Sequence, residues 1–504
     1  MTYVEIFGLL LFIVFTFHLI KRPRIGANEP PLVPYRYPII GHTYDFYRNS
    51  ANFLQNCKEK YGEPFSLYIL GSVRTYTGDE TSYEVFRNSD IFDNSATLKV
   101  FPIVEIFDQF RQFNSPEFRT RVVHEQISGK VNIYTSRMQK EFLSGIEKYF
   151  GDCKEPKVFR NIRNTLGLMV AKPVANVILC EEAAQFEDII TSFVMLEREL
   201  TYMRLVPPIL SFISPSLHTK LLKLPLKFGW NPISQHRDIF VKRCKPIVEE
   251  RLRQRKELGE KYIPKEDLLD FYLNDPNFKT DVADDKYMND LFGQLYEIVF
   301  ASVSTTSRSL SFALFDYAGR PELWDEIYKE QLKIHNESNG ILTTDDIQKM
   351  VKLDCFLKES FRYSSDIVHL IVHTMTKDSY TFSNGTTIPK GRDVYIFAKD
   401  TAFSSKFYGD TVHDFQPKRH ITSNSNGEVV HSPATKVDRS LLTFGGGKHA
   451  CPGRVFAVNE IKMCLHKLIL RYHIRTESGK VDPTIMKATV VLPPASGLVL
   501  KNRN

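Results

Sequence analysis

Cysteine is sparse in this sequence, and its seven residues follow no spacing typical of metal or redox motifs. The count is odd and no C-x-x-C pair occurs, which argues against zinc ribbons and thioredoxin-like sites. A chain of 504 residues also needs no disulfide framework to hold its core together. We therefore expect six of the cysteines to be buried, reduced thiols. Cys451 is the exception, because of the loop in which it lies.

Long blocks of one charge sign are absent as well. The formal charge of +7 comes from 66 basic and 59 acidic residues that are scattered along the chain. Scattered charge gives nucleic-acid binding little support, whereas a weakly basic surface suits an acidic protein partner or anionic lipid. No internal repeat, low-complexity tract or second linker interrupts residues 42–504, so we expect one large domain there.

The first twenty residues differ from the rest of the chain. Between Ile6 and Phe17 only Gly8 and Thr16 interrupt a run of large apolar side chains, and residues 3–20 could span a bilayer as a helix. The basic residues follow this run rather than precede it, and no small-residue cleavage site is present, unlike a cleaved signal peptide. We expect residues 1–21 to be a transmembrane anchor with the following domain on the cytoplasmic side.

Residues 22–41 combine a basic cluster with a proline-rich stretch that contains Pro30, Pro31, Pro34 and Pro38. Proline fixes its own φ and restricts the residue before it, so this segment should be a stiff, extended hinge rather than a helix. It would hold the following domain at a set angle to the membrane.

The rest of the chain predicts a mainly α fold with a small β region. Residues 50–355 are mostly helical in pattern, and 284–317 form the clearest helix, apolar on most faces and therefore interior. Two short β-like runs, 370–374 and 394–397, lie on either side of the turn Asn384-Gly385, a strong hairpin signal.

The segment most informative about chemistry is residues 444–454, FGGGKHACPGR. Its three glycines let the backbone approach a flat ligand, and Cys451 before Pro452-Gly453 can present its sulfur on a tight loop. An apolar helix over 455–470 would follow, with its positive end near that sulfur. A phosphate loop would need Lys followed by Ser or Thr, and a zinc site would need closely spaced ligands besides His449. A sheltered thiolate suits haem iron.

These residues resemble the haem-binding signature of the cytochrome P450 superfamily, F-x-x-G-x-[RH]-x-C-x-G. The signature is met by Phe444, Gly447, His449, Cys451 and Gly453. Two further elements occur in the family's order: an E-x-x-R pair and an F-x-P-x-R segment, which supply Glu359, Arg362 and Arg419. By the resemblance, these three charged residues stabilise the core around the haem rather than react.

The predicted interior helix carries ASVSTT at 301–306, where the family has [AG]-G-x-[DE]-T-T. The resemblance assigns Thr305 to the oxygen-binding site, but Ser304 replaces the usual acid and Ser302 the usual glycine. A hydroxyl cannot supply a proton as a carboxylic acid does, although it can orient a water. His449 should face a haem propionate, and His373 or His369 should replace the propionate-binding arginine of relatives.

The resemblance implies a membrane-bound monooxygenase of the endoplasmic reticulum, with haem b coordinated by Cys451. Its electrons would come from NADPH through NADPH–cytochrome P450 reductase, with cytochrome b5 as a second donor. The sequences of the hinge and of the cysteine loop resemble those of fungal members of the family. This resemblance suggests a terpenoid, steroid or polyketide substrate and a role in secondary metabolism. Candidate substrate contacts are Phe300, Ala301, Ile367 and Ile371.

Two alternatives remain open from the sequence. Because Ser304 weakens the expected proton relay, the protein could instead be a reductase-independent haem-thiolate isomerase or dehydratase that acts on an oxygenated substrate. A non-catalytic haem- or lipophile-binding membrane protein is the third reading. For the electron donor, Lys448, Arg454, Lys462 and Lys467 are candidate contacts, against the alternative of a generic solvated basic face.

Overall fold

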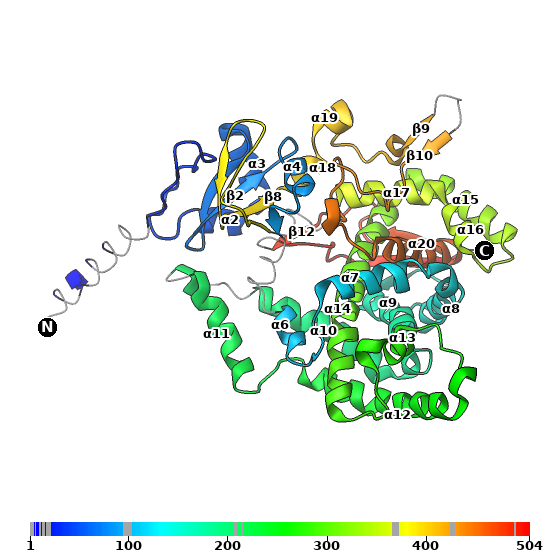
Figure 1. Ribbon diagram of the computed structural model, residues 1–504. Helices are drawn as coiled ribbons and strands as arrows, with labels where there is room; N and C mark the ends of the chain where they lie inside the picture. Colours follow the sequence, from blue (N-terminus) through cyan, green and yellow to red (C-terminus); the bar gives the residue numbers. More distant parts are fainter. Residues whose placement is uncertain are drawn as a thin grey trace.

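The computed structural model describes residues 22–93, 103–205, 209–212, 215–364, 372–423, 429–487 and 490–503, with six scattered positions before residue 22. Helices dominate it (Figure 1). They are α2 (Thr43–Arg48), α3 (Ser50–Tyr61), α4 (Ser82–Arg87), α6 (Ile103–Asp108), α7 (Pro116–Val122), α8 (Val131–Tyr149), α9 (Ile162–Ile178), α10 (Glu187–Leu205), α11 (Pro215–Lys227), α12 (Ser234–Leu258), α13 (Leu268–Asn274), α14 (Asp285–Ala318), α15 (Trp324–Glu337), α16 (Thr344–Gln348), α17 (Val351–Tyr363), α18 (Ala398–Ala402), α19 (Ser405–Tyr408) and α20 (Arg454–Arg471).

The β-strands are short and form a minor part of the fold. The largest sheet has the strand order β1-β2-β8-β5-β3, in which β2 and β8 run parallel and the other neighbours antiparallel. The strands are β1 (Phe65–Ile69), β2 (Ser72–Thr77), β3 (Phe92–Asp93), β4 (Lys157–Phe159), β5 (His373–Met375), β6 (Ser379–Thr381), β7 (Thr387–Pro389), β8 (Asp393–Ile396), β9 (Ile421–Ser423), β10 (Val429–His431), β11 (Tyr472–Thr476), β12 (Ile485–Lys487), β13 (Val490–Leu492) and β14 (Leu498–Asn502). The expected class, mainly α with a small β region, is confirmed.

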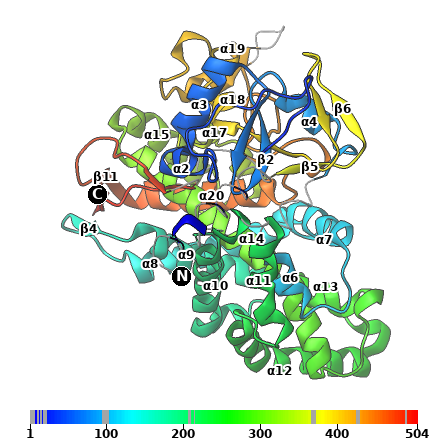
Figure 2. The same cartoon turned by 90° about the vertical axis from the view of Figure 1, so that its left-hand side faces the viewer.

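Helix α14 is the central element of the helical part. It matches the helix predicted over 284–317 to within one residue at each end, and it contacts α9, α10, α12 and α20. Figure 2 shows α20 crossing beside it. Among the described residues, α14 alone is long and apolar enough to cross a membrane, but 67% of its most apolar stretch is buried in the protein. It is a core helix, as its pattern predicted.

The late β region follows the prediction with one rearrangement. The turn at Asn384-Gly385 joins β6 to β7, which form their own hairpin, with Gly385 at φ +87°. The predicted run 394–397 matches β8 to within one residue, whereas the run 370–374 overlaps β5 only at His373 and Thr374, and residues 370 and 371 lie outside the described residues. Strands β5 and β8 pair with each other antiparallel in the five-stranded sheet. The hairpin is therefore an insertion between two paired strands.

The hinge segment packs against the folded domain. The backbone N–H of Val33 donates to the Ser66 carbonyl at 2.9 Å, and the Val33 side chain is buried. Glu29 forms an ion pair with Arg392, next to strand β8. Of the predicted membrane anchor, residues 1–21, fifteen positions lie outside the described residues.

Two of the four basic residues proposed to meet an electron donor are buried. Lys462 is 4% exposed and pairs with Asp354 at 3.1 Å, and Lys467 is 5% exposed and donates to the Gly340 carbonyl at 2.9 Å. Helix α20 is covered by neighbours on more sides than its sequence indicated, so its lysines satisfy interior groups. The predicted four-residue basic face is wrong. Lys448 is the one of the four that lies on the surface as an exposed cation.

Candidate haem-binding site

The cysteine loop folds as a tight turn that ends where α20 begins. The N–H of Cys451 donates to the Phe444 carbonyl at 2.8 Å, which closes the loop on itself. Gly447 has φ +59°, and a Cβ there would collide with the carbonyl oxygen of Phe86 in α4. A Cβ on Gly446 would lie 2.7 Å from the Phe86 ring. The glycines are thus needed because this loop lies directly against α4.

The Cys451 sulfur lies just before the N-terminus of α20, where backbone amides converge. Burial raises the pKa of the Cys451 thiol, while hydrogen bonds from the amides of Gly453 and Arg454 and the charge of Arg454 act to lower it. Helix α20 begins at Arg454, as the apolar pattern predicted. The other six cysteines are free and buried, also as expected.

Helix α14 presents two exposed residues in the middle of its length. Ala301 and Thr305 lie one turn apart and are both exposed, although most of their neighbours along the helix are buried. The Thr305 hydroxyl donates to the Ala301 carbonyl at 2.8 Å, and Ser302 makes the same bond to Ile298. Phe300 is partly buried against the main core. Ala301 and Thr305 therefore form an exposed face in the middle of this core helix, and a ligand could cover that face.

Ser304 occupies a different face of α14 from Thr305. It is 6% exposed and directs its hydroxyl towards Glu197 of α10. Three other predicted residues, Ile367, Ile371 and His369, lie outside the described residues.

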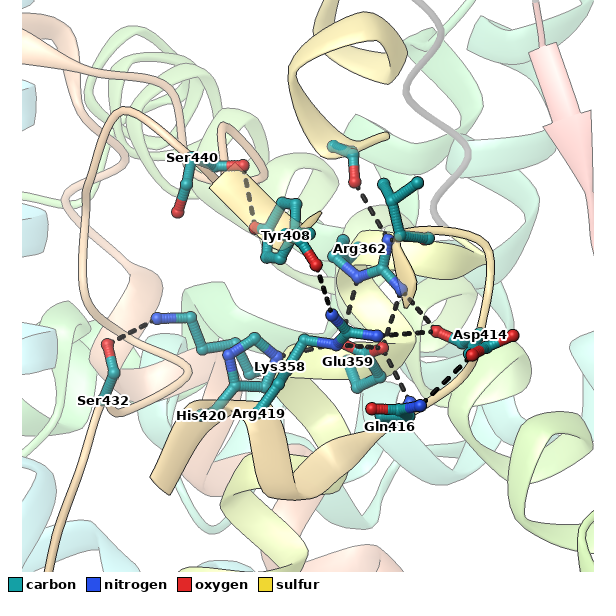
Figure 3. A network of polar contacts seen from close by, with 12 residues as sticks. Lys358, Glu359, Arg362, Tyr408, Asp414, Gln416, Arg419, His420, Ser432 and Ser440 are labelled. Atoms are coloured by element: carbon teal, nitrogen blue, oxygen red, sulfur yellow. Dashed lines mark hydrogen bonds and ion pairs between the residues drawn. The ribbon is translucent and has the colours of Figure 1, made fainter. Parts of the chain in front are cut away.

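A buried ionic cluster connects α17 to the segment before the cysteine loop (Figure 3). Glu359 and Arg362 form two hydrogen bonds, of 2.7 and 3.0 Å, and both side chains are completely buried. Arg419 joins them through Glu359 at 3.1 Å. The predicted E-x-x-R pair and its second arginine therefore lie together.

The cluster also contains groups that the sequence did not single out. His420 bonds to Glu359 at 2.9 Å, and the carbonyls of Ala402, Val412 and Asp414 accept hydrogen bonds from Arg362. Burial opposes the ionised form of Glu359, but His420 and Arg362 outweigh it and lower the pKa of this carboxyl to about 2. Backbone carbonyls carry no residue-type signal, and His420 could be found only from its position beside Arg419.

The sequence model of the family described as cytochrome P450 matches residues 30–501. The chain belongs to the cytochrome P450 family. The resemblance drawn from the cysteine loop and the charged triad is confirmed.

Several curated relatives of this P450 are fungal. Cytochrome P450 monooxygenase 71 of Postia placenta is 34% identical over 201 residues, 40% of this chain and 40% of that protein. Cytochrome P450 monooxygenase olcJ of Penicillium canescens is 31% identical over 277 residues, 53% of this chain and 50% of that protein. Lanosterol 14-alpha demethylase of Candida tropicalis is 24% identical over 495 residues, 93% and 89% of the two chains. The chain thus spans half or less of the first two relatives.

The family implies a haem and electrons from a redox partner, and the residues present in this P450 fit a haem. The buried Nε2 of His449 makes no hydrogen bond to any described residue, so it is available to a ligand group. The His373 ring lies 6.3 Å from the His449 ring and packs edge-on against Phe86 at 5.8 Å. The two histidines, the cysteine loop and α4 therefore lie next to one another in the structure. Acidic propionates would suit imidazole donors there.

Proposed function

We propose that this P450 is a haem-thiolate monooxygenase that oxidises a hydrophobic small molecule. The observation that carries the proposal is the loop holding the Cys451 sulfur beside the amides of Gly453 and Arg454. Amide donors stabilise a thiolate, and the helix N-terminus adds favourable potential. Six other cysteines are buried thiols, so the loop singles out one sulfur for metal coordination.

Each site residue has a defined task. Bound haem b would supply the activation of dioxygen. Cys451 would hold its iron, and His449 and His373 would hold its propionates. Thr305, exposed on α14, would position the proton donors, while Ala301 and Phe300 would contact substrate. Glu359, Arg362 and Arg419 would fix the segment that precedes the cysteine loop.

The surroundings of the reaction follow from the same assignment. We infer that NADPH–cytochrome P450 reductase, aided by cytochrome b5, delivers the electrons. Residues 1–21 would anchor the chain in the endoplasmic reticulum membrane, with residues 22–41 as hinge and 42–504 as the cytoplasmic catalytic domain. A terpenoid, steroid or polyketide substrate in secondary metabolism is supported by the fungal relatives and by the sterol named for one of them. The exposed apolar residues Phe228 and Trp230 are compatible with a lipid surface.

The test is to compare metabolites from cells that carry the wild-type protein or Cys451→Ser, grown under isotopically heavy dioxygen. A monooxygenase predicts that the variant accumulates a precursor lacking one oxygen, and that the wild-type product carries the heavy atom. If the accumulated compound is an isomer or hydrate of the product, and no label enters, the enzyme is an isomerase or dehydratase instead. Equal metabolite profiles would contradict any catalytic role.

A further inference from the structure

Ser304 stands on α14 where the family resemblance expects a carboxylic acid, and a carboxylate lies beside it on another helix. The Ser304 hydroxyl points towards Oε1 of Glu197 at 3.5 Å, which is about 0.5 Å longer than an ordinary O–H···O hydrogen bond. Glu197 belongs to α10, which packs against α14. The acid missing from one helix is therefore replaced in space by an acid from its neighbour.

Glu197 belongs to a charged cluster that extends from the interior to the surface. Its carboxylate forms ion pairs with Arg163 of α9 and, at 3.4 Å, with Arg308, one turn after Ser304 on α14. The exposed fractions rise along this path, from 6% for Ser304 through 13% for Glu197 to 31% for Arg163. Solvent therefore reaches the Arg163 end of the cluster, while the buried end is Ser304, which precedes Thr305 along α14.

We propose that Glu197 is the positioning residue that passes protons from solvent to Ser304, and so supplies the acid function that α14 lacks. The inference rests on the proposed monooxygenase function, because only oxygen activation requires such a supply. Arg163 and Arg308 hold the carboxylate in place from two sides. Thr305, the next residue along α14, is exposed on the face assigned to the haem.

Proton movement along this path is balanced. The Glu197 carboxylate first takes a proton from solvent at the open end near Arg163. The resulting carboxyl gives that proton to the Ser304 oxygen, while the Ser304 hydroxyl releases its own proton to a water on the Thr305 side. A hydroxyl can both donate and accept, so Ser304 returns to its starting state. No electrons move, and each group is regenerated.

The test uses full-length, haem-loaded protein with reductase and NADPH. The substrate source is the lipid extract of cells carrying Cys451→Ser, which would contain the accumulated precursor. Glu197→Gln is compared with Glu199→Gln, a matched control on the same helix whose carboxylate pairs with His236 at 3.0 Å instead. The product rate should fall about 100-fold in Glu197→Gln, as expected for loss of a positioned acid, and stay at the wild-type value in Glu199→Gln.

Three further variants test whether Glu197 acts through Ser304. Adding Ser304→Asp to Glu197→Gln puts a carboxylate back on α14, one turn from Arg308, and should restore most of the rate. Independently of turnover, thermal unfolding is measured for Glu197→Gln, for Ser304→Ala and for the variant that combines these two changes. The shifts in Tm of the two single variants should not add up to that of the combined variant, because the two side chains interact.

The results distinguish the two proposals. Suppose that the wild-type protein incorporates oxygen into the product in an NADPH-dependent reaction and that Glu197→Gln does so equally fast. The proposed relay is then overturned, and the proposed monooxygenase function is retained. Additive shifts in Tm, or no rescue by Ser304→Asp, would also overturn the relay. Wild-type protein without NADPH-dependent turnover would overturn both.

Discussion

At the scale of single residues, Gly447 is the position in the cysteine loop that accepts a side chain least well. Its φ of +59° disfavours any residue with a Cβ, and that atom would also collide with the Phe86 carbonyl oxygen. Backbone cannot move aside as a flexible side chain can. Gly447 therefore fixes the distance between α4 and the loop that carries Cys451.

Gly447→Ala should destabilise the protein by about 3 kcal/mol and reduce the haem bound per chain. Gly479→Ala is the control, because Gly479 has a similar φ of +70° but nothing within 4 Å of its added Cβ. The control should lose only the conformational part, about 1 kcal/mol, and keep its haem. Chemical unfolding and the Soret absorbance measure both quantities. Equal losses in the two variants would show that the contact with Phe86 is unimportant.

The sequence predicted those site residues whose type and spacing along the chain form a recognisable pattern. Cys451 and the glycines before it belong to a pattern with fixed spacing, and the structure brings them into one turn. Glu197 could not be predicted in the same way, because its place beside Ser304 depends on the packing of α10 against α14. Ser304 departs from the family pattern and so indicates that an acid must come from another element, but the sequence does not say which acid lies nearby.

At the scale of elements, the charged cluster at the end of α17 shows how burial decides the value of a sequence motif. The chain has other Glu-x-x-Arg pairs, and one of them, Glu250 and Arg253 on α12, has similar hydrogen bonds. That pair is exposed, whereas Glu359 and Arg362 are completely buried. Spacing alone would have treated the two pairs alike, and only the other family motifs distinguished them.

Glu359→Gln should destabilise the fold by about 3–5 kcal/mol, because it leaves the buried Arg362 guanidinium without its counter-charge. Glu250→Gln should leave stability unchanged, because its pair is solvated and screened. Denaturant unfolding of the two variants, which carry the same chemical change, measures the difference. A similar small effect in both would mean that the buried cluster does not stabilise the fold.

The same carboxyl predicts a dependence of stability on acid. Its pKa in the folded protein is about 2, below the ordinary value of 4.5, so the folded state favours the ionised form. The stabilisation is therefore complete above pH 4.5 and is lost as the pH falls towards 2. The stability gap between wild type and Glu359→Gln should narrow across that interval. A gap that stays constant with pH would contradict the role of Arg362, Arg419 and His420 in holding the charge.

At the scale of the whole molecule, the periodicity of the sequence predicted the class of fold correctly, but the sequence did not predict which basic residues lie on the surface. The core helix α14 and the helix after the cysteine loop were both found from apolar pattern, because burial requires apolar residues on most faces. The basic face failed because Lys462 and Lys467 turn inward to Asp354 and to the Gly340 carbonyl. A long lysine stem can lie in a core when its ammonium group finds a partner, and sequence pattern does not reveal that partner.

The organisation into anchor, hinge and domain predicts that the first 21 residues serve location rather than folding. The hinge already contacts the domain through Val33 and Ser66, so a chain that begins at residue 22 keeps those contacts. This shortened chain should move from the membrane pellet to the supernatant on ultracentrifugation and bind haem as the full chain does. A shortened chain that still sediments with membranes would place the main attachment elsewhere.

The central claim is that Cys451 holds a haem iron, and one spectrum tests it most directly. The carbon monoxide difference spectrum of the reduced protein is recorded for wild type, Cys451→Ser and Cys464→Ser. Cys464 is the control because it lies on α20 close to Cys451 in sequence but is fully buried, and burial raises its pKa so that it stays a thiol. We predict the thiolate-type band in wild type and Cys464→Ser, and its loss in Cys451→Ser. A thiolate-type band that survives in Cys451→Ser would contradict the account.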